Sequence, residues 1–155
     1  MQEIIGWGLL ILGGTLYIAQ IISSVNFQLA QRLGIQENPE FTDKITQRSE
    51  RYVAYWDLVT LCWLPLGGIL MIINHEWWPI MSLIGGAIYL DTSGREAAKN
   101  ISFRHEGIKV GTERQRKAEK GRERQRKLFF SSYIAMAIIA ITIIAYSISS
   151  LLSRL

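Results

Sequence analysis

Hydrophobic residues in this chain gather in four long runs, and polar residues gather between them. The runs extend over residues 4–25, 53–73, 79–90 and 128–152. The hydrocarbon of a bilayer is about 30 Å thick, so a spanning helix needs about 20 mostly apolar residues. The first, second and fourth runs meet that length. Because lipid offers the backbone no hydrogen-bond partners, each of these three runs predicts a membrane-spanning helix.

The third apolar run is too short to span a membrane by itself, since it would rise only about 18 Å as a helix. Trp77 and Trp78 precede it, and indole rings favour the membrane interface. A helix that starts there must continue to about Ala98 to reach the other side. The chain therefore predicts an all-α integral membrane protein. We expect an antiparallel bundle of four transmembrane helices over 4–25, 53–73, 78–98 and 128–152.

The distribution of Lys and Arg predicts the orientation, because basic residues near the ends of spans stay in the cytoplasm. The connection 26–52 holds four basic residues, and the segment 95–127 holds twelve. The short connection 74–76 holds none. We expect one domain over residues 1–155, with cytoplasmic loops at 26–52 and 99–127 and a short outer hairpin. Both termini would lie outside the cytoplasm, in a plasma or inner membrane.

Charged residues close to the predicted spans suggest a polar cluster. Asp57 lies 17 residues before Asn74, and Asp91 lies 14 residues after Trp77. Helical rise puts both at about 21–25 Å from the hairpin. The expected cluster consists of Asp57, Asp91, Arg95, Ser131, Ser132 and Tyr133. An ionisable group inside the membrane costs about 2.5–3.5 kcal/mol, so such groups are expected to pair or to have a function. The cluster is therefore either a structural clamp between helices or an ion or proton site.

Glycine doublets occur at similar depth in the first three predicted spans. Small residues let helix backbones approach closely in lipid, and Pro65 should kink the second span and free the carbonyl of Leu61. The sequence predicts tight packing here, or alternatively a hinge or pore constriction. The residues concerned are Gly13, Gly14, Pro65, Gly67, Gly68, Gly85 and Gly86.

A basic repeat precedes the fourth span: residues 113–117 have the same sequence as residues 123–127. Almost nothing in it is apolar, so it is either a solvated extension of the fourth helix or disordered. We expect it to hold this end in the cytoplasm and to bind anionic lipid headgroups or a partner. The basic residues are Arg114, Arg116, Lys117, Lys120, Arg122, Arg124, Arg126 and Lys127. Nucleic acid is not expected, because arrays of stacking aromatic residues are missing.

No motif in the sequence indicates a reaction, a metal or a cofactor. His75 and His105 fall on opposite sides of the predicted membrane, and no HExxH, CxxC or phosphate-binding glycine loop is present. Aspartates at equal depth on two spans resemble those of intramembrane aspartyl proteases, which makes that class a remote alternative. However, Asp91 lacks the glycine pair that precedes the second aspartate of those enzymes.

Four short helices enclose little volume, which favours a non-enzymatic membrane protein that acts by assembly. It would be a homo-oligomer or an accessory subunit of a membrane complex. The alternative is a small oligomeric channel or a cation or proton transporter. In that case Asp57 and Asp91 would supply cation preference along a pore between subunits.

Overall fold

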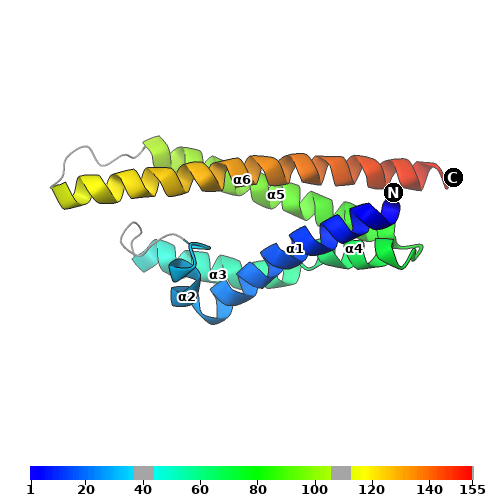
Figure 1. The fold of residues 1–155 in the computed structure, drawn as a ribbon, viewed down its shortest axis with the longest axis horizontal. Helices are drawn as coiled ribbons and strands as arrows, with labels where there is room; N and C mark the ends of the chain where they lie inside the picture. The colour runs from blue at the N-terminus through cyan, green and yellow to red at the C-terminus, as the bar shows by residue number, and fades with distance from the viewer. Residues whose placement is uncertain (37–43, 106–112, 155) are drawn as a thin grey trace.

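The computed structural model describes residues 1–36, 44–105 and 113–154 of the chain. Within these ranges the chain forms six helices and no strand (Figure 1). The predicted all-α fold is therefore confirmed for the described residues. The helices are α1 (Gln2–Val25), α2 (Phe27–Arg32), α3 (Lys44–Thr60), α4 (Trp63–Ile72), α5 (Trp78–His105) and α6 (Glu113–Leu152).

Three helical segments in the described part of the chain are long and apolar enough to cross a membrane. They are Gln2–Val25, Gln47–Ile72 and Lys127–Leu152, and they correspond to the first, second and fourth predicted spans. The second of them combines α3 and α4. Helix α5 has 28 residues, which is ample length, but its second half carries several charged residues. It is therefore not among the three.

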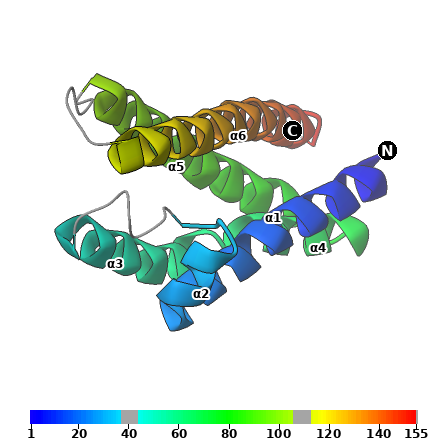
Figure 2. The ribbon, with the colours of Figure 1, turned by 60° about the vertical axis from the view of Figure 1, so that its left-hand side comes forward.

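The helices form two groups that meet at one end of the molecule. Helix α1 packs against α4 and α3, helix α5 packs along α6, and the contact between α4 and α5 joins the groups. Figure 2 shows α5 and α6 together on one side, with α1, α3 and α4 on the other. The buried core includes Leu9, Leu64, Trp78, Tyr89 and Ile143. The hydrophobic core thus involves α1, α4, α5 and α6.

The second predicted span is broken where Pro65 predicted a kink. Helix α3 ends at Thr60 and α4 begins at Trp63. Proline has no N–H to donate, and its ring clashes with the carbonyl four residues earlier, here that of Leu61. The phenol of Tyr89, from α5, donates to this carbonyl at 3.5 Å. The broken helix thus gains a buried partner from a neighbouring helix.

Close packing at the glycine doublets is present at five of the six predicted positions. A methyl group added at Gly13 would lie 2.9 Å from Pro65, and one added at Gly68 would lie 2.7 Å from the carbonyl oxygen of Gly6. Gly67, Gly85 and Gly86 are crowded in the same way. Gly14 differs, because nothing lies within 4 Å of its added carbon. Adjacent helix positions point in directions about 100° apart, so only one glycine of the first doublet can face α4.

Both chain termini lie beside the hairpin that joins α4 and α5 (Figure 1). The side-chain amide of Gln2 donates to the carbonyl oxygen of Met71 at 3.0 Å and to Oδ1 of Asn74 at 3.1 Å. The guanidinium of Arg154 donates to the carbonyl oxygen of Glu76 at 2.8 Å and lies over the ring of Trp78. These contacts fix the start of α1 and the end of α6 to the hairpin.

The two long connections are more helical than expected. Helix α2 and the first turns of α3 fall within the expected loop 26–52, while α5 continues to His105 and α6 starts at Glu113. The basic repeat is therefore the helical extension, not the disordered alternative. The side chains of Arg124 and Lys127 are exposed. Those of Arg114, Arg116, Lys117, Lys120, Arg122 and Arg126 lie outside the described part.

Candidate functional site

A cavity of about 330 Å³ lies between the two groups of helices, on the α2 and α3 side of the molecule. Five helices contribute to its wall, which also includes Ile35 and Gln36 after α2. Most of the lining surface is apolar, although about half of the lining residues have charged or polar side chains. Leu61, between α3 and α4, also belongs to the lining. The helices contribute Leu16, Gln20, Phe27, Glu50, Val53, Ala54, Asp57, Thr92, Glu96, Lys99, Phe129, Ser132, Tyr133 and Met136.

Asp57 is the most deeply placed charged residue of this cavity, with an exposed fraction of only 4%. Helical spacing puts it on one face of α3 with Ala54 and Leu61, and both of these are also buried. Within the described part of the chain its carboxylate forms no hydrogen bond or ion pair. Arg95 acts on it electrostatically without contacting it. A buried carboxylate without a direct partner is costly, which marks Asp57 as the centre of the candidate site.

The predicted burial of Asp91 and Arg95 beside Asp57 is wrong. Nε of Arg95 lies 2.9 Å from Oδ2 of Asp91, and the side chains are 59% and 65% exposed, respectively. The pair occupies the outward face of α5, whereas Tyr89 and Ser93 occupy the buried face. Counting residues along a helix predicts depth but not direction around the axis, which is why the error arose.

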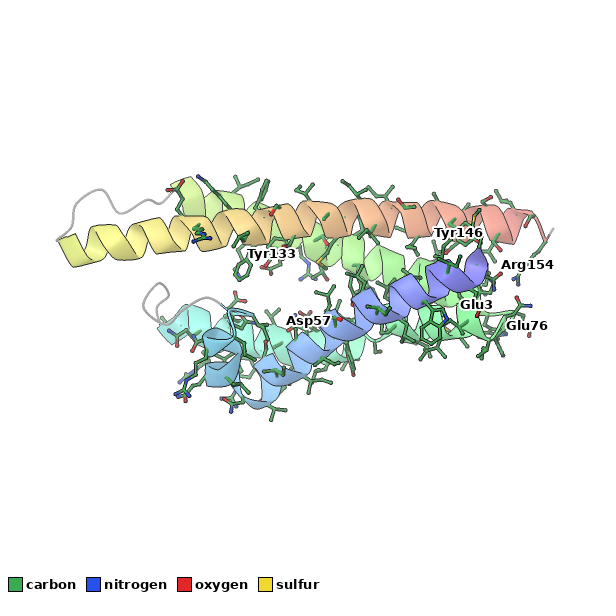
Figure 3. All side chains as sticks on the ribbon, in the orientation of Figure 1. Glu3, Asp57, Glu76, Tyr133, Tyr146 and Arg154 are labelled. Carbon is green, nitrogen blue, oxygen red and sulfur yellow. The ribbon has the colours of Figure 1, made fainter. Side chains whose placement is uncertain are left out.

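The predicted residues of α6 divide between two faces. Ser132 and Tyr133 line the cavity and Ser131 does not, although both serines are exposed. Both serine hydroxyls donate to the carbonyl oxygen of Leu128 at 2.9 Å. Figure 3 shows Tyr133 projecting from α6 toward the side of the molecule that holds Asp57. The structure thus brings Asp57, Ser132 and Tyr133 together around one cavity.

Two polar groups of the cavity were not predicted from the sequence. Oε1 of Gln20 and Oγ1 of Thr92 are buried, and neither has a hydrogen-bond partner in the described structure. Both residues belong to the lining, from α1 and α5. The sequence prediction relied on charged residues near the spans, and Gln20 and Thr92 are neutral. Their oxygens are buried behind the cavity surface without a partner in the described structure.

An ion-paired group at the cavity margin was also missed. Lys99 of α5 pairs with Glu50 of α3, and its Nζ lies 3.6 Å from Oε2 of Glu96. Glu50 and Lys99 both fell in segments expected to be loops. A signal was available, because Glu50 precedes Ala54, Asp57 and Leu61 at spacings of four, three and four. That spacing is typical of a single helix face.

The cavity lining offers carboxylate, ammonium, amide, hydroxyl and phenol groups. No lining residue is a histidine or cysteine. Among the residues that the structure describes, no group of three His, Cys, Asp or Glu side chains could hold a metal ion. Comparisons of the chain with family models, curated proteins and solved structures find no match. Its function is therefore inferred from its own geometry.

Proposed function

We propose that the chain crosses the membrane four times, with α5 as the additional span and both termini outside the cytoplasm. The contacts of Gln2 and Arg154 with the hairpin support this topology. They place both termini and the hairpin at one end, so α5 and α6 must cover the same depth in opposite directions. The basic residues at the other end favour a cytoplasmic location for it.

We further propose that the protein acts by assembly, through the exposed face of α6. The supporting observation is a line of exposed residues at alternating spacings of four and three. It consists of Ser131, Ala135, Ile138, Thr142, Ala145, Ser149 and Leu152, here named the α6 stripe. Most of its members are small, none is charged, and all lie in the apolar part of α6.

This stripe has the properties of a helix-packing surface in lipid. Small side chains let two helices approach closely, and close van der Waals packing drives their association. A repeat of seven residues keeps one face in contact along a left-handed pair. The hydroxyl of Thr142 already donates to the carbonyl oxygen of Ile138 at 2.9 Å, so contact with an apolar surface leaves no donor unpaired. The stripe therefore suits a second copy of itself.

Two identical stripes can meet about a two-fold axis parallel to the helices, which produces a closed dimer. The exposed isoleucines beside the stripe, namely Ile134, Ile141 and Ile148, would contact lipid in this dimer. We also propose that anionic lipid headgroups on the cytoplasmic side bind the basic extension of α6, near the exposed Arg124 and Lys127.

Cysteine cross-linking in native membranes tests this dimer. The chain has one cysteine, Cys62, and Cys62→Ser provides the background. Single cysteines at stripe positions 138, 142 and 145 should form disulfide-linked dimers on mild oxidation. Cysteines at the flanking positions 134, 141 and 148 are matched controls that should cross-link poorly. Equal cross-linking at both sets would contradict the stripe as the interface, and so would a native mass showing one copy bound to a different chain.

No observation among the described residues favours the channel or protease alternatives. A pore between subunits needs unpaired acids on outward faces, but Asp57 is buried and the exposed Asp91 is paired with Arg95. An aspartyl protease needs two carboxylates that share a proton. Asp91 is instead paired with Arg95.

A further inference from the structure

We propose that the cavity around Asp57 binds an amphipathic organic cation: a protonated amine or quaternary ammonium group attached to a small apolar body. This site is separate from the assembly surface. Its α6 residues Phe129, Ser132, Tyr133 and Met136 recur at helical spacing on the face toward α5 and α3. The α6 stripe lies on the exposed face.

The size and walls of the cavity favour an organic ligand. A volume of about 330 Å³ lies within the usual range of ligand pockets, about 300–1,000 Å³. Most of the wall surface is apolar, and about half of the lining side chains have no polar atom, among them Leu16, Val53, Leu61 and Met136. Such a surface stabilises an apolar body by removing it from water.

The charges favour a cation over an anion or a neutral molecule. Three carboxylates line the cavity, those of Glu50, Asp57 and Glu96, against the single ammonium of Lys99. Lys99 pairs with the two glutamates. This leaves Asp57 as the acid with no direct partner in the described structure. The nearby Arg95 is exposed and paired with Asp91, so it does not occupy the position of a ligand.

Two neutral oxygens favour a nitrogen-centred cation. Oε1 of Gln20 is an obligate acceptor, and Oγ1 of Thr92 can accept; both are buried without a partner in the described part. Neither oxygen is open to solvent in this structure, so an amine N–H group in the cavity would bond to them only after a side-chain rotation. An anion would meet lone pairs and carboxylates instead.

Aromatic residues and the lack of metal ligands favour an organic cation over a metal ion. Phe27, Phe129 and Tyr133 belong to the wall, and aromatic faces attract organic cations within about 6 Å. A bare Ca²⁺ ion would need six to eight oxygen ligands. The described residues contain no cluster of acids, histidines or cysteines that could hold a metal.

Titration calorimetry on the full chain in maltoside detergent micelles, whose neutral headgroups carry no ammonium group, tests the site, with benzyltrimethylammonium as the probe. We expect saturable binding to the unaltered protein. Asp57→Asn should weaken it by about tenfold or more, because a buried charge pair contributes at least the energy of one decade in affinity. Asp91→Asn is the matched control, an acid on an exposed face, and should leave affinity within about twofold. Neopentylbenzene, the neutral isostere, should bind much more weakly than the cation.

A second variant covers the case in which Asp57→Asn fails to fold. Ala54 is buried and lines the cavity, so Ala54→Leu should fill the space and reduce binding while keeping the carboxylate. Lack of saturable binding to the unaltered protein would overturn the site. So would equal affinity for the neutral isostere, or equal effects of the two aspartate variants. The cross-linking pattern of α6 is measured independently, so failure of this site leaves the dimer proposal unaffected.

Discussion

At the scale of single residues, one hydroxyl connects three segments in the middle of the protein. Tyr89 is only 2% exposed, and its Oη lies 3.5 Å from the carbonyl oxygens of both Gly13 and Leu61. The carbonyl of Leu61 lacks the usual helical donor because that donor would come from Pro65. In lipid no water replaces it at low cost. Tyr89 therefore stabilises the break that the proline imposes.

Tyr89→Phe should lower the free energy of unfolding by about 1 kcal/mol, because a buried acceptor loses its donor. Unfolding of the purified protein by a denaturing detergent in mixed micelles measures this change. Tyr52→Phe is the matched control, since Tyr52 is exposed and its loss should have no measurable effect. Equal stability of the Tyr89 variant and the unaltered protein would show that the hydroxyl contributes nothing to the break.

Residue-scale predictions from the sequence succeeded where spacing along one helix carried the information. Pro65 predicted the break, and Asp57 was predicted as a buried polar residue, which its 4% exposure confirms. Asp91 and Arg95 were misplaced because depth does not define which way a side chain points. Gln20 and Thr92 were missed, since their importance depends on the absence of partners in the described fold.

At the scale of helices, the packing of α1 on α4 depends on glycines that face each other's backbone. A carbon added at Gly68 would lie 2.7 Å from the carbonyl oxygen of Gly6 and 2.8 Å from the amide nitrogen of Leu10. Backbone atoms cannot rotate away as a side chain can. The two helices would therefore have to separate.

Gly68→Ala should destabilise the protein by about 1–3 kcal/mol, the usual cost of overpacking a close-packed interior. Gly14→Ala is the matched control, because nothing lies within 4 Å of its added carbon. Alanine is also the better helix former by about 0.5–1 kcal/mol, so this control should be neutral or stabilising. The same detergent unfolding assay reports both. A Gly68 variant as stable as the Gly14 variant would contradict the tight contact between α1 and α4.

The existence of the helices was more predictable than their ends. Long apolar runs predicted three spanning helices because hydropathy alone defines them. The mixed-charge segments around Glu50 and Lys99 were expected to be loops. These residues instead belong to helices and pair across the cavity, through a contact that is not local in sequence. Hydropathy does not depend on such partners, so it indicates neither the start of α3 nor the end of α5.

At the scale of the whole molecule, both termini converge on the hairpin, where Figure 3 shows Glu3, Glu76 and Arg154 at the same end. Helix α6 has 40 residues, or about 60 Å at 1.5 Å per residue, which is about twice the thickness of the hydrocarbon. Its first half therefore extends beyond the apolar layer at the end opposite the hairpin. The molecule has one compact end and one elongated basic end. Such an asymmetry is expected of a membrane protein whose basic end stays on the cytoplasmic side.

The proposed orientation, with both termini and the hairpin outside, predicts which residues can be labelled from outside an intact cell. In the Cys62→Ser background, Glu3→Cys, Glu76→Cys and Ser153→Cys should react with a membrane-impermeant maleimide, because all three positions are exposed at the hairpin end. Arg124→Cys, on the basic extension of α6, should react only after the membrane is permeabilised. Labelling at positions 3 and 76 but not at 153 would mean that α5 or α6 fails to cross. The four-span proposal would then be wrong, even though the three most apolar helices would still be compatible with the membrane.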